Sequence, residues 1–492
     1  MGLSYIWDVV VMENITLILL LVYAITILST AALVIHEKRD PVKTSAWVLV
    51  LILLPIVGFI FYIFFGQYHR KQKIFSRKEI KDLEQIEKLS KNQLSRLKHK
   101  NYTNNEEVKK NLSIISLLLN NSKALLTENN RVAIYQKGKD AFDAIIAEIE
   151  RAEESIHIEY YIVSNDKLGN RIKEALIRKA QQGVEVRFIF DDVGSWSLPK
   201  RFIKDLVTAG VKIFPFMEVK FPIFTSKVNY RNHRKIVVID GKVGFLGGMN
   251  IADRYIEGNK ELGPWVDTQL RIEGESVQWL QVVFLMDWYF VSGELINDKL
   301  KYFPEHKVEE THAIQITASG PDSDWSSIMQ AYFVAITKAK HHIYISTPYF
   351  VPNESILTAL KTAALSGIDV RIILPGKSDS TVVYWSSLSY VLELLEAGIK
   401  VYLYQKGFNH SKIMMIDSSF ASVGSANMDI RSFEDNFEVA AIVYDSEITT
   451  ELERSFIKDI RRSHRITIED WENRPLKQSF KESFARLFSP LF

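Results

Sequence analysis

Residues 233–250 read HRKIVVIDGKVGFLGGMN, and residues 410–427 read HSKIMMIDSSFASVGSAN. In both stretches a lysine follows the first histidine by two residues, an aspartate by seven, a glycine by fourteen and an asparagine by seventeen. A chance match of every offset is negligible in a chain that holds 11 histidines. The repeated motif therefore predicts two related halves.

Each copy of the motif is expected to enter a buried strand. Residues i and i+2 of a strand face the same way, so His233 projects with Lys235, and His410 with Lys412. The apolar runs that follow, IVVI and IMMI, are typical of strands that are covered on both faces.

The end of each motif combines an acid with small residues. Asp240 and Asp417 follow the apolar runs, where a carboxylate can hold the following turn. The pairs GG at 247–248 and GS at 424–425 leave room for a ligand or for another stretch of backbone. Imidazole, ammonium and amide groups, presented twice, are suited to a phosphate-like anion. A metal site is disfavoured, because lysine is a poor ligand at neutral pH and the chain has no cysteine.

The doubled pattern resembles the signature of the phospholipase D superfamily. The resemblance implies that the two motifs meet across a pseudo-two-fold interface to form one active site that needs no cofactor. One histidine would attack phosphorus and form a phosphohistidine, while the other acts as general acid and then base. Which histidine attacks stays open. The implied catalytic residues are His233, Lys235, Asp240, His410, Lys412 and Asp417, with Asn250 and Asn427 around the phosphate.

An arginine and an acid follow each motif. The arginines are Arg254 and Arg431, at matching offsets, and salt bridges within the scaffold account for them as well as substrate contact does. The acid on the later strand is Glu438 in the second copy. In the first copy the strand pattern favours Asp267, after a six-residue insertion, over Glu261 at the direct offset. Such an acid would fix the tautomer of an imidazole.

An internal repeat starts near residue 130. The strand-like IHIEYYIV, a helical stretch and GVEVRFIF match HIYISTPYF, a helical stretch and GIDVRIIL. Strands that alternate with helices indicate a largely parallel sheet in each half, with ligand-facing loops at 191–192 and 375–376. We predict an α/β fold of two repeated phospholipase D-like sandwich domains, 131–310 and 311–492, related by a pseudo-two-fold axis.

Composition limits the alternatives. A chain of 492 residues with 47% apolar residues can build more than one sizeable core. With 61 Lys+Arg against 59 Asp+Glu the net charge is +2, so no bulk charge attracts nucleic acid, which counts against a nuclease. The absence of cysteine excludes disulfides and thiol catalysis.

The N-terminal region predicts membrane insertion. Two apolar runs, 15–35 and 46–65, are each long enough to span a bilayer and predict a two-helix transmembrane hairpin over 1–66. A charged helical linker is expected over 67–130, and its residues 67 to about 110 are expected to be solvated. Basic residues lie both in the short loop and after the second run, so charge alone points both ways. We expect the catalytic region on the cytoplasmic side, because the resemblance implies substrates made on that leaflet.

Two further apolar stretches have two interpretations each. The first copy carries an extra stretch, 214–232, whose phenylalanines and lysines fit an interfacial loop or an edge hairpin equally. The C-terminal SFKESFARLFSPLF would either dock onto the second domain or lie in the membrane interface. Its one apolar helical face consists of Phe480, Phe484, Leu487, Phe488 and Leu491.

Two apolar spans ahead of a doubled motif region resemble the bacterial cardiolipin synthases, as do GPWVDTQLRIEG and RSFEDNFE. The resemblance implies transfer of a phosphatidyl group from one phosphatidylglycerol to another, with release of glycerol, by a multi-pass protein of the bacterial cell membrane. Phosphatidylglycerol and other anionic phospholipids are the expected partners, nucleic acid is not, and a homo-oligomer is allowed. The alternatives are a membrane-anchored hydrolase or nuclease of the same type, or a lipid-binding scaffold, which would not need both histidines.

Overall fold

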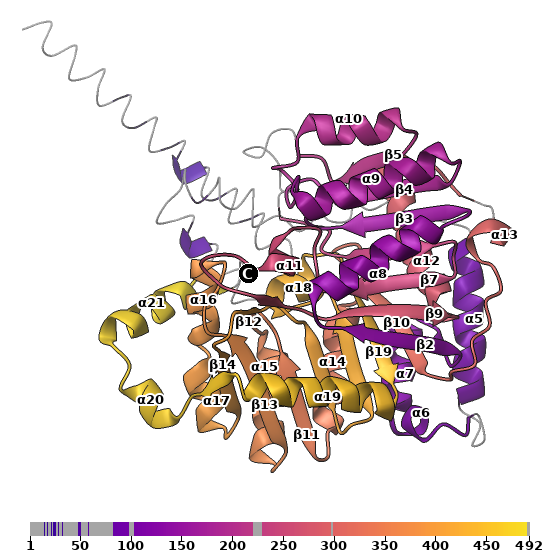
Figure 1. Cartoon of the computed structure of the whole chain (residues 1–492). Helices are drawn as coiled ribbons and strands as arrows, with labels where there is room; N and C mark the ends of the chain where they lie inside the picture. Colours follow the sequence, from indigo (N-terminus) through magenta and orange to yellow (C-terminus); the bar gives the residue numbers. More distant parts are fainter. Residues whose placement is uncertain are drawn as a thin grey trace, which may run out of the picture. The chain divides into compact units, whose positions relative to one another are not determined.

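The computed structural model describes residues 82–97, 103–219, 229–296 and 299–489, together with scattered positions between 14 and 58. The chain divides into two compact units, of which the larger contains 78–218 and 230–492 (Figure 1). Within the described part, no helix is both long and apolar enough to cross a membrane. Most of the predicted hairpin, the tip of the extra stretch (220–228) and Leu491 lie outside the described residues.

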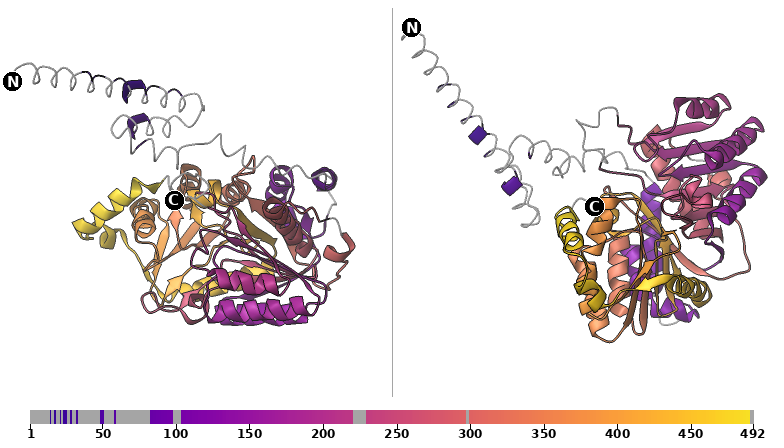
Figure 2. Two further views of the ribbon diagram at one scale, coloured as in Figure 1. Left: turned by 90° about the horizontal axis from the view of Figure 1, so that it is seen from above. Right: turned by 60° about the vertical axis from the view of Figure 1, so that its left-hand side comes forward.

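The larger unit contains two sheets with the same strand order. The first runs β2-β9-β7-β6-β3-β4-β5, and the second runs β1-β10-β19-β17-β16-β11-β13-β14-β20, which repeats that order once β1 and β20 are set aside. The two sheets lie in two lobes, the first above the second in Figure 1 and again distinct in Figure 2. The chain is thus a mixed α/β protein with two related halves.

The strands of the first sheet are β2 (Asn130–Tyr135), β3 (Ser155–Tyr160), β4 (Glu185–Asp191), β5 (Lys212–Phe216), β6 (Lys235–Ile239), β7 (Val243–Gly247) and β9 (Gln269–Gly274). Those of the second are β1 (Leu126–Thr127), β10 (Ala313–Ser319), β11 (His342–Ser346), β13 (Asp369–Pro375), β14 (Lys400–Tyr404), β16 (Ile413–Ile416), β17 (Phe420–Gly424), β19 (Glu438–Tyr444) and β20 (Ser463–Arg465). Four short strands stand apart: β8 (Trp265–Val266), β12 (Phe350–Val351), β15 (Phe408–Asn409) and β18 (Met428–Asp429).

The prediction of a largely parallel sheet is wrong. In the first sheet β3, β4 and β5 are parallel, but β2, β9, β7, β6 and β3 pair antiparallel in turn, and the second sheet follows the same pattern. The reason lies in the connections. Helices link β3, β4 and β5, whereas the motif strand β6 turns directly into β7. A short turn can join only antiparallel neighbours.

Helices cover the outer face of each sheet, and two further helices join the strands of both sheets in the core between them. The helices that follow the first half's strands are α8 (Gly138–Arg151), α9 (Lys167–Gln181), α10 (Lys200–Thr208), α11 (Arg254–Glu257), α12 (Ser276–Ser292) and α13 (Lys299–Tyr302). The second half has α14 (Ser327–Lys338), α15 (Glu354–Leu365), α16 (Thr381–Leu388), α17 (Val391–Glu396), α18 (Ile430–Glu434), α19 (Ser446–Ile460), α20 (Ile468–Glu472) and α21 (Leu476–Arg486). Side chains of α12 and α19 share one core with both sheets.

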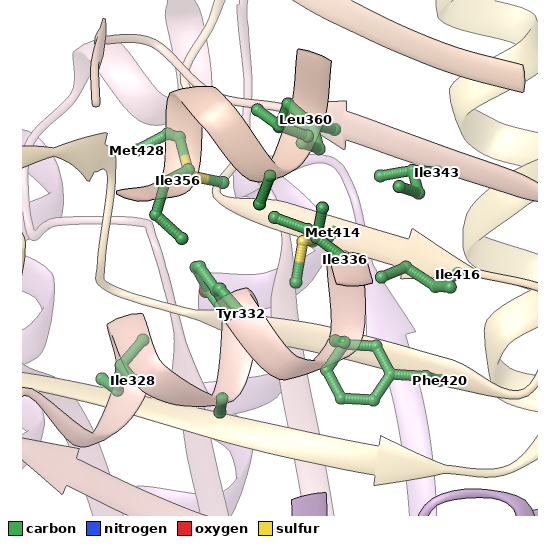
Figure 3. Packing of buried hydrophobic residues seen from close by; sticks show 14 of the residues in the cluster. Ile328, Tyr332, Ile336, Ile343, Ile356, Leu360, Met414, Ile416, Phe420 and Met428 are labelled. Atoms are coloured by element: carbon green, nitrogen blue, oxygen red, sulfur yellow. The ribbon is translucent and has the colours of Figure 1, made fainter. Parts of the chain in front are cut away.

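The motif strands are buried on both faces, as their apolar runs predict. Val237 and Ile239 pack into the outer core of the first half, while Ile236 and Val238 pack into the core between the sheets. In the second half Met414 and Ile416 belong to the outer core, where Figure 3 shows them among side chains of α14 and α15. Each such side chain contributes about 1.5–3 kcal/mol by leaving water, so the backbone at the motifs is rigidly held.

The solvated linker prediction is wrong for its last part. Helix α5 (Asp82–Leu97) has the expected exposed residues, but α6 (Glu106–Lys110) and α7 (Leu112–Asn121) place apolar side chains in the second half's outer core. Val108, Ile115 and Leu118 are fully buried there. The apolar residues of α7, which include ISLLL at 115–119, dock this helix despite the charged residues that flank it, because a helix needs only one apolar face to dock. The domain boundaries near 66, 130 and 310 stay predictions.

The two apolar stretches behave differently. Within the described part of 214–232, Phe216 is buried with its ring 4.9 Å from that of Phe437, so it is a packing residue and not part of an interfacial loop. Helix α21 docks on α16, where Lys481 Nζ lies 4.8 Å from the ring centre of Trp385. It nevertheless leaves three large apolar side chains exposed, namely Leu476, Phe480 and Phe484, at 89%, 74% and 56%, and Leu487 and Phe488 just after it are exposed at 74% and 37%.

Candidate active site

Each motif histidine contacts an acid from the other half. His233 Nδ1 lies 3.0 Å from Glu438 Oε1, and His410 Nδ1 lies 2.7 Å from Asp267 Oδ2. Glu438 is 0% exposed and Asp267 is 2% exposed. An acid at Nδ1 orients the ring and leaves Nε2 of His233 for a ligand, whereas Nε2 of His410 also lies 3.2 Å from Lys412 Nζ. The acids that the sequence singles out therefore lie beside the histidines, but crossed between the halves.

Short strand pairings between the halves create this crossing. The segment before His410 forms β15, which pairs in parallel with β8, so that Asn409 stands opposite Val266. In the same way Asn232 forms a parallel bridge with Phe437. Both histidines donate a backbone hydrogen bond across these pairings: His410 N donates to Val266 O at 2.7 Å, and His233 N donates to Phe437 O at 2.9 Å. The next residue on each partner strand is the acid, so backbone register alone brings acid and histidine together.

The two motif lysines lie beneath the histidines. Lys412 Nζ donates to the backbone oxygen of His410 at 2.6 Å, and Lys235 Nζ donates to that of His233. Lys235 is 0% exposed and Lys412 is 3% exposed. Burial lowers the pKa of Lys235 to about 7 and that of Lys412 to about 8. Two cations near their ionisation points can respond strongly to a bound phosphate.

Burial also sets the pKa values of the imidazoles and their acids. It lowers the pKa of His233 to about 4, against the pull of Glu438, and it lowers the pKa of His410 well below its usual range. It raises the pKa of Asp267 to about 7. For Glu438, burial is outweighed by the charges of His233 and Lys235 and by the hydrogen bond with His233, so its pKa falls below the usual value. The acids thus differ in charge near neutral pH.

The motif aspartates do not belong to the site, and their assignment as catalytic residues is wrong. Asp240 Oδ1 accepts from the backbone nitrogens of Glu154 and Ser155, each at 2.8 Å. Asp417 holds the start of β11 in the same way, through the backbone nitrogens of residues 340–342. Each aspartate stands at the far end of its motif strand, about 16 Å from the lysine at about 3.3 Å per residue. They hold the strand that neighbours the motif strand.

The small residues after the motif make room for the neighbouring strand and its acid. A Cβ atom at Gly248 would lie 2.2 Å from Asp267 Oδ1, so only glycine lets this carboxylate approach His410. The matching residue of the second copy is Ser425, whose hydroxyl donates to Glu438 Oε2. The close approach that the sequence predicts is therefore to protein atoms.

Both histidines line one cavity of about 340 Å³. Of the predicted residues around the phosphate, Asn250, Asn427, Arg254 and Arg431 also line it. The other lining residues are Tyr161, Ile162, Arg231, Tyr255, Tyr349, Asp379, Ser380, Val383, Asp429 and Asn436. The cavity thus combines three arginines with two imidazoles, a composition that suits an anion.

The two asparagines are engaged differently. Asn250 uses both ends of its amide, because Oδ1 accepts from Ile162 N at 3.1 Å and Nδ2 donates to Tyr255 Oη at 2.6 Å. Asn427 Nδ2 donates to Asp429 Oδ2 at 3.1 Å. Its Oδ1 is buried with no hydrogen bond to the described residues. Equal offsets in the sequence therefore give unequal surroundings.

Sequence reasoning missed the residues just before each histidine. An asparagine precedes the histidine in both copies, and Oδ1 of Asn232 and of Asn409 accepts from the backbone nitrogen two residues on, at 3.1 and 3.0 Å. The shared offset could have revealed this turn. Arg231, which lines the cavity and donates to Asp191 Oδ1 at 3.2 Å, has no counterpart in the second copy and gave no such signal. The described residues include no group of three or more metal-ligating side chains.

Two family models match this chain. The family described as "Cardiolipin synthase, PLD-like domain" matches residues 145–288 and 332–460, together more than half of the chain. The family described as "Phospholipase_D-nuclease N-terminal" matches residues 18–67. The first match covers both motifs, and the second covers most of the first apolar N-terminal run and all of the second.

Curated relatives are similar over nearly the whole chain. A cardiolipin synthase of Alkalihalophilus pseudofirmus is 43% identical over 475 residues, which cover 96% of this chain and 93% of the relative. A cardiolipin synthase of Geobacillus kaustophilus is 44% identical over 465 residues, covering 94% and 91%. One from Listeria monocytogenes is 41% identical over 476 residues, covering 96% and 98%.

A solved structure shares the fold. The crystal structure of phosphatidylserine synthase from Haemophilus influenzae superposes with a TM-score of 0.57 at 15% sequence identity. The alignment covers 78% of this chain and 97% of that chain. It supports the architecture of two related halves.

Proposed function

Because this chain belongs to the cardiolipin synthase family of phospholipase D-type enzymes, we propose that it transfers a phosphatidyl group from one phosphatidylglycerol to a second. The products are cardiolipin and glycerol. The observation that carries the proposal is the pair of histidines on one cavity, each with an acid of the other half at Nδ1. Two such imidazoles provide a nucleophile and a proton carrier.

The reaction proceeds in two displacements at phosphorus. In the first, Nε2 of one histidine forms a bond to phosphorus, and the bond from phosphorus to the glycerol oxygen breaks. The other histidine gives that oxygen a proton, because the bound phosphate anion raises the pKa of this imidazole above its lowered value in the empty site. In the second, a hydroxyl of another phosphatidylglycerol gives its proton to the second histidine, and its oxygen displaces the phosphohistidine nitrogen. Lys235, Lys412 and the arginines of the cavity balance the charge on the phosphate oxygens.

Transfer, as opposed to hydrolysis, requires that water reaches the phosphohistidine slowly. His233 is 8% exposed and His410 is 5% exposed, and the cavity that they line is only about 340 Å³. Such a cavity admits a head group and leaves little room for bulk water beside it. The hydrolase with the same first step remains the second candidate, since it differs only in using water as the acceptor.

The deciding experiment identifies the lipid product. Purified protein with labelled phosphatidylglycerol should form cardiolipin and glycerol, and His233→Ala and His410→Ala should each lower turnover by about 10⁴-fold or more, because the two groups act as a unit. Phosphatidic acid as the main product of the wild-type protein would replace the transferase by the hydrolase.

We also propose that the chain is held in the bacterial cell membrane by a hairpin over 1–66, with its catalytic region in the cytoplasm. The match of residues 18–67 to the N-terminal family model and the apolar sequence of that region support this. Full-length protein should stay in the membrane fraction, and protease added outside intact spheroplasts should leave the catalytic region uncut. Cleavage of the catalytic region would show that it lies on the outer side of the membrane.

The exposed face of α21 supports a second membrane contact. Phe480 and Phe484 are exposed on a helix that also carries Lys477 and Lys481. Helix α21 packs on α16, whose residue Val383 lines the cavity. An apolar face beside basic side chains is suited to an anionic lipid surface. Contact there would bring the cavity to its substrate.

A further inference from the structure

One carboxylate of the cavity has no role in the reaction described above. Asp379 follows β13 and precedes α16, and it lines the cavity together with Ser380 and Tyr349. Tyr349 Oη donates to Asp379 Oδ1 at 2.7 Å, and Ser378 Oγ lies 3.4 Å from the same oxygen. The side chain is therefore fixed through one oxygen. Its other oxygen, Oδ2, accepts no hydrogen bond from the residues that the structure describes.

The second carboxylate of the cavity is fully used. Asp429 Oδ1 accepts from the backbone nitrogen of Ser432 at 2.7 Å, and Oδ2 accepts from Asn427 Nδ2 at 3.1 Å. Asp429 is 5% exposed, whereas Asp379 is an exposed residue. Asp379 thus offers a ligand a charged acceptor that Asp429 does not.

The matching position of the first half carries no carboxylate. Counted from the matching ends of β4 and β13, the position of Asp379 corresponds to Ser195. Ser195 is 2% exposed, its hydroxyl donates to Tyr161 O at 3.1 Å, and it accepts from Val163 N at 3.0 Å. The buried serine serves the backbone, while the exposed aspartate faces the cavity. At this pair of matching positions, only the second half therefore presents a carboxylate to the cavity.

A carboxylate repels a phosphate, so Asp379 gains nothing from the reacting group. It is, however, a strong acceptor for a hydroxyl group, and charged acceptors make the stronger hydrogen bonds. A head group that carries hydroxyls beyond its phosphate would satisfy both parts of the cavity. Its phosphate would meet the arginines, and its hydroxyls would meet Asp379.

We propose that Asp379, oriented by Tyr349, binds a hydroxyl of the polyol that accepts the phosphatidyl group. The inference rests on the proposed transferase function and names the acceptor class of that site, a vicinal diol. One hydroxyl of the diol bonds to Asp379 Oδ2 while its neighbour reaches the phosphohistidine. Asp379 is a binding residue that selects the acceptor, and it takes no part in proton transfer.

Two short alcohols test the inference, because 1,2-propanediol differs from 1-propanol only by the secondary hydroxyl. Wild-type protein with phosphatidylglycerol as donor should transfer to the diol about tenfold more efficiently than to 1-propanol, as one hydrogen bond to a charged acceptor allows. Asp379→Ala should bring this ratio to about one, mainly through lost transfer to the diol. Tyr349→Phe, which releases the carboxylate, should give an intermediate ratio.

Glu396→Ala is the matched control, because Glu396 is an exposed carboxylate on α17 that does not line the cavity. It should leave the ratio unchanged. Should Asp379→Ala not fold, Asp379→Asn keeps the size of the side chain and removes its charge, and it should still lower the ratio. An unchanged ratio in a folded, active Asp379 variant would overturn the inference and leave the transferase standing. Wild-type protein that transfers to neither alcohol and forms no cardiolipin would overturn the transferase, and this inference with it.

Discussion

The two halves present the same histidine, lysine and acid, but the side chains behind them differ. Behind the first motif, on the side of the inner core, Arg234 donates to Asp287 and to Glu438 O, the latter at 3.2 Å. Asn232 donates to Glu159 in the same buried network. In the second half, Ser411 and Ser346 occupy the positions of Arg234 and Glu159. Ser411 Oγ accepts from Thr268 Oγ1 at 3.2 Å, and Ser346 Oγ donates to Asn409 Oδ1 at 3.2 Å.

This difference shows that the site geometry does not depend on what supports it. An ionic network and a hydroxyl network hold the same Nδ1–acid pairs, because the strand pairing between the halves sets the positions of the backbone. The supporting networks differ in cost. Buried charges are expensive to isolate, whereas hydroxyl groups lose little when a neighbour is removed. The first half should therefore be the more sensitive to substitution.

The acids offer the largest test of the comparison. Glu438→Gln should lower kcat by about 10³–10⁴-fold at pH 7, because it removes an ionised partner of an imidazole. Asp267→Asn should cost about tenfold less at that pH, since the pKa of Asp267 is raised to about 7 and part of the wild-type protein is already neutral there.

The pH dependence sharpens this prediction. Asp267 gains its charge as pH rises through about 7, so the ratio of wild-type to Asp267→Asn rates should rise across that range. The ratio cancels the titration of groups that both proteins share. Steady-state rates between pH 5.5 and 8.5 provide the measurement, and a flat ratio with equal losses in both variants would mean that the two acids are equivalent.

Substitution behind the motifs tests the cost of the two networks. Arg234→Ser places the second half's residue in the first half and isolates buried carboxylates, which should cost about 3–5 kcal/mol of unfolding free energy. Ser411→Ala, the control on the other side, should cost about 1 kcal/mol. Urea unfolding of the detergent-solubilised protein compares them, and similar midpoints would show that the ionic network contributes no more than the hydroxyls do.

The lysines should lose their charges in sequence as pH rises. The pKa of Lys235 is lowered to about 7 and that of Lys412 to about 8, so the cationic form that binds phosphate is lost first in the first half. Above pH 8, kcat/KM for phosphatidylglycerol should fall by about tenfold per pH unit for each lysine involved. In Lys235→Met the residual activity should begin its decline near 8, and a decline that still begins near 7 would assign the first titration to another group.

Helix α21 belongs to the second half alone and should give the smallest effect. Replacing both Phe480 and Phe484 by serine should weaken binding to anionic vesicles by about tenfold, because two rings that enter a lipid interface only in part together contribute about 1.4 kcal/mol. The control is Leu365→Ser, because Leu365 on α15 is a large apolar side chain that is 74% exposed and lies outside α21, whereas the buried Phe216 would not be a suitable control. Vesicle flotation of the full chain gives the reading, and equal flotation of all variants would exclude α21 as a membrane contact.

Sequence patterns predicted the local features of this protein. Offsets of two residues place His233 with Lys235, and unbroken apolar runs place the motif strands between two cores, because strand periodicity and burial act over a few residues. The repeat of these local patterns along the chain likewise predicted two related halves. The motif aspartates show the limit: their spacing marked them as part of the motif, but spacing along a strand does not tell which end reaches the ligand, and their carboxylates hold β3 and β11.

Only the tertiary structure decided which acid serves which histidine. Glu438 lies 205 residues from His233, and Asp267 lies 143 residues from His410, each in the opposite half. No local preference encodes such a pairing. It follows from two short parallel pairings between the halves and from the core that α12 and α19 share with both sheets. The exposure of Asp379, against the burial of Ser195 at the matching position, arises in the same way, because packing and not sequence offset determines which side chain faces the cavity.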